Sequence, residues 1–218
     1  MLSAKTWVFN IMVPDSEVSE IDPPAALGRF FRGKPPKVWG VGNPEIIGSP
    51  LLGIVSARQI DSDLALKSSQ LLKRLASLKE IAFISGWHSP LEEEALRIVL
   101  AHDAPLIFCV SKSLDRFKPS SEIQGRLSEG NVLLLSHCSP NAKRISREAS
   151  VRRNQLVAGL ASVLVVLSAP AGSNSLDLAK SALRYGKRVY APDHRMNNEL
   201  LACGGLPATS ANIRAALG

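Results

Sequence analysis

Small and hydroxyl-bearing residues follow most of the short apolar runs of this 218-residue sequence. The segments concerned are SARQ at 56–59, SGWHS at 85–89, SKS at 111–113, SHCS at 136–139 and AGSNS at 171–175. Small residues let the backbone approach a phosphate, hydroxyl and backbone N–H groups bind its oxygens, and arginine adds a charge-assisted contact. One such segment is an ordinary serine-capped turn, but five of them at one edge of a sheet predict an anion site.

The densest basic segment of the chain is NAKRISREASVRRN, at 141–154. It holds five cations and a single acid, Glu148, and on a helix Arg144 and Arg147 would share one face. The whole chain has a formal net charge of +7 and a pI of about 9.6. This balance favours a polyanion or an anionic ligand as partner, and a merely solvated basic surface is the alternative.

Short apolar runs alternate with longer, helix-compatible segments between Leu51 and about Pro192. The runs are GIVSA, IAFIS, PLIFCV, NVLLLS, SVLVVLS and RVYAP. This alternation predicts an α/β fold: a Rossmann-like, doubly wound, mainly parallel sheet with helices on both faces. Ligands of such sheets bind beyond the carboxyl ends of the strands, where the segments described above are expected to lie.

Three helices carry clear sequence signals. The leucines of 61–78 lie mostly on one helical face. Ser89-Pro90-Leu91-Glu92 is a capping box with proline at the first helical position, and it predicts a helix to about Ala101. Ser175 is predicted to cap a further helix that stops at Gly186.

Residues 1–50 are rich in proline and glycine, and they predict an irregular lead-in packed on the core, with one short strand at 37–41. Residues 51–218 are predicted to form the Rossmann-like domain. The three cysteines, Cys109, Cys138 and Cys203, are far apart and odd in number, which fits a reducing cytoplasm. No run approaches the ~20 apolar residues of a membrane span. No P-loop, metal cluster or dinucleotide fingerprint is visible, so we expect no cofactor and no metal.

Residues Arg153 to Leu160 read RNQLVAGL, and the strand SVLVVLS, the segment SNSLDLA at 173–179 and GKRVYAP follow. This order resembles the DNA-processing protein A family, also called Smf, whose pattern is RNRIIAGLS, an apolar strand, SGSLxTA and a GRxVxAxPG-like segment. GIVSAR, Ile84-Ser85-Gly86 and LLLSHCSP resemble further parts of that family. The chain departs from the pattern at Gln155, Asn174 and Leu178, and its loop after Gly86 is shorter.

The resemblance implies an extended Rossmann fold that binds single-stranded DNA in a basic pocket at the sheet edge. It also implies homodimers and the loading of a RecA-type recombinase during natural transformation. We therefore predict a protein whose function is to bind nucleic acid rather than to catalyse a reaction. The predicted phosphate-binding residues are Ser56, Arg58, Ser85, Gly86, Lys143, Arg144, Arg147, Arg152, Arg153, Asn154, Gly172, Ser173 and Ser175.

Two alternatives use the same pocket. The segment 170–177 resembles the PGGxGTxxE loop of the phosphoribohydrolases called lonely-guy proteins, which release a base from a nucleoside monophosphate. Their chemistry needs a carboxylate near the ribose, and Asp177 would supply it in place of glutamate. Asp177 is equally explained as a first-turn acid favoured by the helix dipole. The other alternative is a sensor that binds a nucleotide without turnover.

Three further residues invite a functional interpretation. His88 has no evident carboxylate neighbour in the sequence and is expected to be a loop histidine. Trp87 could stack on a base or pack in the core. His137 and Cys138 are adjacent at a strand end, so their side chains are expected to point to opposite faces, which argues against a catalytic Cys–His pair.

Overall fold

The computed structural model describes residues 18–31, 33–142 and 147–218. In these ranges nine strands form one sheet in the order β1-β2-β6-β5-β4-β3-β7-β8-β9. The strands are β1 (Ser19–Ile21), β2 (Val38–Gly42), β3 (Leu51–Val55), β4 (Ala82–Ser85), β5 (Leu106–Val110), β6 (Val132–Ser136), β7 (Val163–Val166), β8 (Val189–Ala191) and β9 (Leu206–Pro207). Neighbouring strands in the stretch β6-β5-β4-β3-β7-β8-β9 are parallel. Strand β2 pairs antiparallel with both β6 and β1. The predicted doubly wound, mainly parallel sheet is confirmed.

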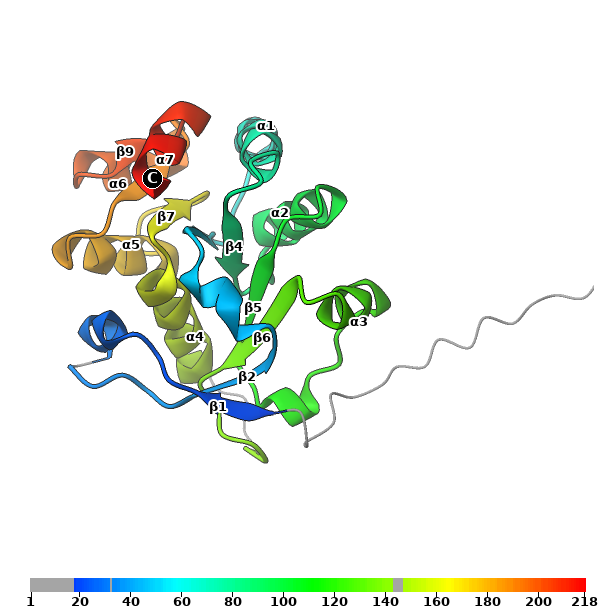
Figure 1. The fold of residues 1–218 in the computed structure, drawn as a ribbon. Helices are drawn as coiled ribbons and strands as arrows, with labels where there is room; N and C mark the ends of the chain where they lie inside the picture. The colour runs from blue at the N-terminus through cyan, green and yellow to red at the C-terminus, as the bar shows by residue number, and fades with distance from the viewer. Residues whose placement is uncertain (1–17, 32, 143–146) are drawn as a thin grey trace, which may run out of the picture.

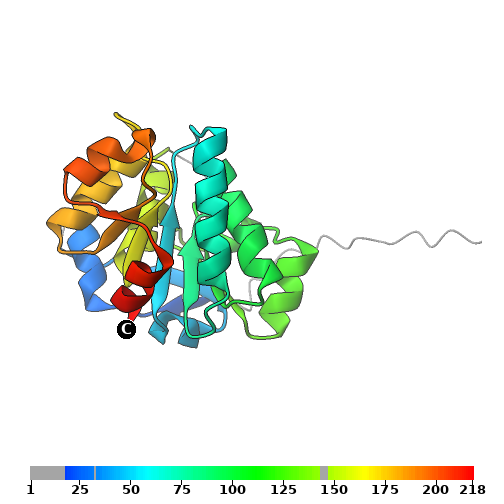
Figure 2. The same cartoon turned by 90° about the horizontal axis from the view of Figure 1, so that it is seen from above.

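Helices cover both faces of this sheet (Figure 1). On one face lie α1 (Ser62–Ala76), α2 (Pro90–Ala101) and α3 (Ser121–Ser128), and on the other lie α4 (Arg147–Leu160) and α5 (Asn174–Arg184). Figure 2 shows the strands between these two layers, seen from above. Two shorter helices, α6 (Asn198–Ala202) and α7 (Ser210–Leu217), and the 3-10 segments η2 (Ala25–Phe30), η3 (Pro44–Gly48), η4 (Leu114–Arg116) and η5 (Arg195–Asn197) complete the fold.

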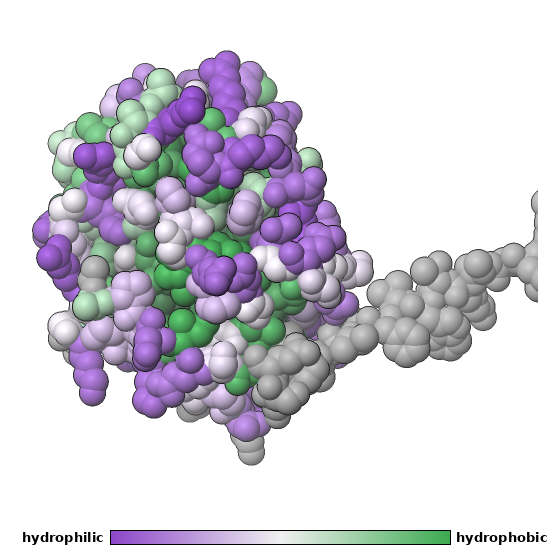
Figure 3. All heavy atoms as spheres, viewed as in Figure 1, coloured by the Kyte–Doolittle hydropathy of each residue, from purple (hydrophilic) through white to green (hydrophobic). Residues whose placement is uncertain are grey.

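The strands separate two hydrophobic cores. Alternate side chains of a strand point to opposite faces, so Phe83 packs with α1 and α2 while its neighbour Ile84 packs with α4 and α5. Almost every residue of the parallel strands is buried, which explains why these strands read as continuous apolar runs. On the face seen in Figure 3, hydrophilic side chains cover most of the surface over α1, α2 and α3, with apolar side chains visible between the elements.

Local capping signals set the starts of the helices, with one correction. The capping box of α2 is present in full: Ser89 accepts from the backbone of Glu92, and the Glu92 side chain accepts in return from the backbone of Ser89. The cap of α5 was misplaced by two residues, because Ser173, not Ser175, accepts from the backbone of Leu176. The helix therefore starts at Asn174.

The direction of winding changes between β3 and β7. The chain runs outward from β3 through β4, β5 and β6, and then crosses back to place β7 on the other side of β3. Ligands of doubly wound sheets bind at such a switch point, beyond the carboxyl ends of the strands. The loops after β3, β4 and β7 consequently lie where the sequence predicts the anion site.

Residues 18–50 contribute β1 and β2 to the sheet, and β2 pairs with β6. The short strand predicted at 37–41 is confirmed, shifted by one residue. The division of the chain at residue 50 stays a prediction. Along the described residues, no helix is both long and apolar enough to cross a bilayer.

Candidate nucleic-acid interface

Arg153, on α4, lies at the carboxyl end of the sheet with only 4% of its surface exposed. Its Nε and Nη2 donate to Asn154 Oδ1 at 3.1 and 2.9 Å, and Nη2 also donates to His88 Nε2 at 2.9 Å. Gly86 makes room for this side chain, because a Cβ at that position would lie 2.6 Å from Arg153 Nε. The structure thus brings together three of the predicted site residues, Gly86, Arg153 and Asn154.

His88 links Arg153 to Glu92, in the first turn of α2. An arginine can only donate, so His88 Nε2 is the acceptor and the ring proton sits on Nδ1, which is 2.9 Å from Glu92 Oε2. The expectation that His88 has no carboxylate neighbour is wrong. Glu92 is four residues further on, and the capping box turns its side chain back over the N-terminus of α2, towards His88.

The carboxylate of Glu92 is held from several sides, with 1% of the residue exposed. Its oxygens accept from the backbone N–H of Ser56 at 2.9 Å, of His88 at 3.1 Å and of Ser89 at 3.3 Å. The row from Arg153 through His88 to Glu92 therefore crosses the sheet edge from one helical layer to the other. It also ties the loop after β3 to the loop after β4.

Charges within this row compensate each other. Burial alone would raise the pKa of Glu92, but its hydrogen bonds from the side chain and backbone of His88, together with the charge of Arg153, place that pKa below its ordinary value. Burial lowers the pKa of Arg153, Glu92 opposes that shift, and nearby Arg58 adds to it. Arginine keeps its proton at any pH a protein tolerates. The buried site therefore holds a fixed positive charge balanced by one carboxylate.

Exposed positive charge surrounds this buried arginine. Arg58 follows β3 and is exposed, and Arg152 is exposed and pairs with Glu148 at 3.1 Å. Arg147 is the first residue of α4. The predicted Lys143 and Arg144 lie outside the described residues. Arg58 and Arg152 thus both present exposed guanidinium groups near Arg153, and that of Arg152 is shared with Glu148.

The predicted hydroxyl lining is used largely for local structure. Ser56, Ser85 and Ser175 are buried, and each hydroxyl bonds within its own or a neighbouring loop. Gly172 is exposed and adopts a φ of +72°, which turns the chain ahead of α5. The bonds run from Ser56 Oγ to Ala57 O (2.9 Å), from Trp87 N to Ser85 Oγ (3.3 Å), from Leu176 N to Ser173 Oγ (3.2 Å) and from Ser175 Oγ to Ser168 O (2.8 Å).

His137 and Cys138 do meet, contrary to the sequence-based expectation. Cys138 Sγ lies 3.6 Å from His137 Nε2, because β6 ends at Ser136 and the alternation of a strand no longer applies. Burial lowers the pKa of His137 to about 4, with Arg152 and Arg153 adding to the shift. Burial also raises the pKa of the Cys138 thiol. A neutral thiol beside a neutral imidazole is not an activated nucleophile, so the pair does not support catalysis.

Trp87 packs in the core. It is buried, its Nε1 donates to Ile107 O at 3.1 Å, and its ring lies 6.4 Å from that of Phe108. A buried ring has no face free for a base, so packing rather than stacking describes Trp87.

Asn197 is a structural residue that sequence reasoning missed. Its amide is fully buried and binds the N–H of Ala169 at 2.9 Å and the carbonyls of Leu167 and Pro192 at 3.1 and 3.0 Å. These contacts fix the loop after β7. No local pattern signals the role, because Asn197 follows that loop by almost thirty residues in the sequence.

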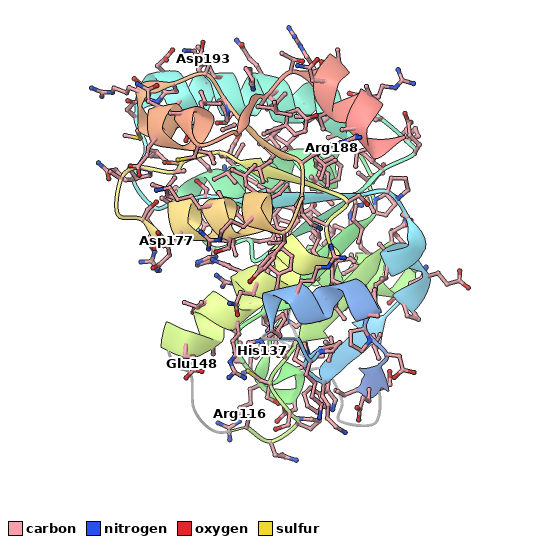
Figure 4. All side chains as sticks on the ribbon, turned by 90° about the vertical axis from the view of Figure 1, so that its left-hand side faces the viewer. Arg116, His137, Glu148, Asp177, Arg188 and Asp193 are labelled. Carbon is pink, nitrogen blue, oxygen red and sulfur yellow. The ribbon has the colours of Figure 1, made fainter. Side chains whose placement is uncertain are left out.

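A pocket of about 220 Å³ lies between α4 and α5, next to Asn154. Figure 4 shows Glu148 and Asp177, from the first turns of α4 and α5, on the same side of the molecule, with Arg188 on the opposite side. Among the described residues, no cluster of three His, Cys, Asp or Glu side chains is arranged to hold a metal ion. The pocket is lined by Phe30, Val151, Asn154, Gln155, Asn174, Asp177, Leu178, Ser181 and Tyr185.

The fold and this edge define a class: a doubly wound α/β protein with fixed and exposed arginines at the switch point of its sheet. The profile of the family described as DNA recombination-mediator protein A matches residues 19–215. The chain belongs to this family, whose members take part in DNA processing. The comparison with curated proteins gives no match.

Solved structures share the fold. DNA processing protein A from Streptococcus pneumoniae superposes with a TM-score of 0.74 at 21% identity, over 89% of this chain and 70% of that chain. DNA processing protein A from Helicobacter pylori, a structure described for its single-stranded DNA binding mode, gives 0.72 at 23% identity, over 92% of this chain and 94% of that one. The molybdenum cofactor binding protein from Rippkaea orientalis gives 0.53 at 16%, over 78% and 94% of the two chains.

Proposed function

We propose that this protein binds single-stranded DNA through its phosphates at the carboxyl edge of the sheet. The observation that carries the proposal is Arg153, which Asn154 and His88 hold over Gly86 at the switch point. Membership of a family of DNA recombination mediators supports the proposal, as does the single-stranded DNA binding of the Helicobacter pylori relative.

The site is suited to a phosphate because its central cation cannot move freely. Three of the five N–H groups of Arg153 bind Asn154 and His88, and this leaves the two on Nη1 for an incoming oxygen. A side chain already held in place loses little conformational entropy on binding. Arg58 and Arg152 add exposed charge on either side, and Lys143, Arg144 and Arg147 would extend the track for a longer strand.

The loops would supply the remaining contacts. The backbone N–H groups near Gly86, Gly172 and Ser175 are the donors we assign to the phosphate oxygens, because the N–H groups of Ser56 and Ser173 already bond to Glu92 and to Pro170 O. The serine hydroxyls have a different part in the proposal, because their local hydrogen bonds keep the loops in shape.

Asp177 is the residue on which a phosphoribohydrolase function would depend. It is an exposed acid in the first turn of α5, where the helix dipole explains its presence. Incubation with AMP tests this second function: release of free adenine that Asp177→Asn abolishes would establish it, and no release would remove it.

We also propose a homodimer and a RecA-type recombinase as partner, in a cytoplasmic process such as natural transformation, because the resemblance to the DNA-processing protein A family implies them. Sedimentation equilibrium of the purified chain tests the dimer. Pull-down of a purified RecA-type recombinase, with and without a bound oligonucleotide, tests the second partner.

Fluorescence anisotropy of a labelled 20-nucleotide single strand tests the central proposal. Log Kd should rise linearly with log salt. Contacts from the three described arginines alone give a slope near 2, since each phosphate contributes about 0.7 for single strands. A protein that fails to bind the strand at low salt, or binds it with no salt dependence, would contradict the proposal.

A further inference from the structure

We propose that the pocket between α4 and α5 takes one base of the bound strand, and that Asp177 makes it select guanine. The inference rests on the proposed function, because the base belongs to the strand whose phosphates lie at Arg153. It adds a sequence preference that phosphate contacts cannot provide, since phosphates carry no sequence information.

One wall of the pocket is a continuous stripe along α5. Asn174, Asp177, Leu178, Ser181 and Tyr185 follow each other at helical spacing and all line the pocket. Such a stripe presents an apolar side chain and a ring beside polar groups. This combination suits a nucleobase, which needs a flat apolar contact and hydrogen bonds at its edge.

The aromatic part of the pocket is preformed. The rings of Phe30 and Tyr185 are 5.0 Å apart, at an angle of 69°, and both line the pocket. Phe30 comes from η2, which packs on α4, so its position is set by the fold rather than by a ligand. A volume of about 220 Å³ is below the ~300–1000 Å³ of sites for drug-sized ligands, and it fits one ring system rather than a whole nucleotide.

Asn154 connects the pocket to the phosphate site. Its Oδ1 accepts both bonds from Arg153, and the same residue lines the pocket. Its Nδ2 is therefore the end left to donate to a base. A phosphate at Arg153 and a base beside Asn154 would belong to the same or neighbouring nucleotides.

Asp177 supplies the selectivity. An ionised carboxylate has two oxygens that only accept hydrogen bonds. Guanine is the DNA base that presents two adjacent donors, N1–H and the N2 amino group, on its pairing edge, with the O6 acceptor beside them. Asp177 matches the two donors, and the amide of Asn154 or Gln155 matches O6. In the described ranges, 18–31, 33–142 and 147–218, the Asp177 carboxylate has no hydrogen bond or ion pair of its own, and Lys180, the cation on which its charge acts, is paired with Glu199.

Two labelled 20-mers, alternating thymine with guanine or thymine with inosine, test this inference by anisotropy at constant salt. Inosine lacks only the N2 amino group, so losing one hydrogen bond to a carboxylate should weaken wild-type binding about tenfold. Asp177→Asn should reduce that ratio to less than threefold. Glu122→Gln is the matched control, because it removes one negative charge from the first turn of another helix, α3, and it should keep the tenfold ratio.

The outcomes separate the two proposals. Equal binding of the two strands by the wild type, or a ratio that persists in Asp177→Asn, would overturn the guanine assignment and leave phosphate binding intact. Absence of binding to both strands at low salt would overturn the proposed function itself. The comparison of guanine with inosine uses only the wild-type protein, so it decides the question even if Asp177→Asn does not fold.

Discussion

Replacing Glu92 with glutamine should destabilise the fold by about 2–4 kcal/mol. One carboxylate oxygen accepts from Ser56 N–H, and the other accepts from His88 and Ser89 N–H and faces His88 Nδ1. The amide oxygen of glutamine can accept the hydrogen bonds made by one of these carboxylate oxygens. Its NH₂ group would then face the buried N–H donors that the other carboxylate oxygen accepts from. One unpaired buried donor costs about 1–3 kcal/mol, and the lost countercharge to Arg153 adds to it.

Urea denaturation at pH 7 measures this effect. Glu93→Gln is the control, because Glu93 lies in the same turn of α2 but is exposed, and its replacement should cost less than about 0.5 kcal/mol. Equal effects of the two substitutions would refute the idea that the Glu92 network holds the sheet edge together.

The same pair of proteins gives a pH test. The pKa of Glu92 is lowered from 4.5 in the folded state, so the carboxylate stabilises the fold above pH 4.5. This contribution is lost as pH falls through the folded pKa. The difference in stability between the wild type and Glu92→Gln should therefore shrink steadily below pH 4.5, and a difference that is constant or grows there would contradict the burial of an ionised Glu92.

Three further predictions follow from single contacts. Burial lowers the pKa of His137 to about 4, so as pH falls below 6.5 this histidine is protonated in the unfolded chain before it is protonated in the folded protein. Thermal melting should therefore show that the wild type loses stability from pH 6.5 down to 4, and that His137→Gln loses less over the same range. Lys187 Nζ donates to Gly159 O at 3.3 Å, at the end of α4, so Lys187→Met should lower the free energy of unfolding in urea by about 1–2 kcal/mol. Gly86→Ala places a Cβ against Arg153, and its anisotropy titration should show about the same loss of DNA affinity as Arg153→Ala, with little further loss in the double variant.

Much of the fold could be predicted because its signals are local. Buried parallel strands read as apolar runs, and the capping box of α2 lies within four consecutive residues, 89–92. The cap of α5 is less clear from the sequence, because Ser173 and Ser175 are both suitable capping residues and only the structure shows that Ser173 accepts from Leu176 while Ser175 lies in the first turn.

The candidate site could be predicted only in outline. The family pattern and the strand ends pointed to Arg153 and Gly86, but not to the burial of the arginine or to its contact with His88, which lies 65 residues away in the sequence. The capping box already accounts for Glu92 in the sequence, so the sequence does not predict its second role, which is to bind the Ser56 N–H and face His88 at the edge of the sheet. Such roles depend on tertiary contacts, which local spacing does not encode.

The affinity of Arg153→Ala for a 20-nucleotide single strand at low salt tests the central claim most directly. We expect a loss of at least tenfold, the size of one charge-assisted contact, with Arg58→Ala also weakening binding while leaving the buried row intact. Arg188 is exposed and directly precedes β8, at the amino end of the sheet, so Arg188→Ala removes the same charge away from the site and should change the affinity less than twofold. Equal losses for Arg153→Ala and Arg188→Ala, or full affinity in Arg153→Ala, would contradict a phosphate site at the carboxyl edge of the sheet.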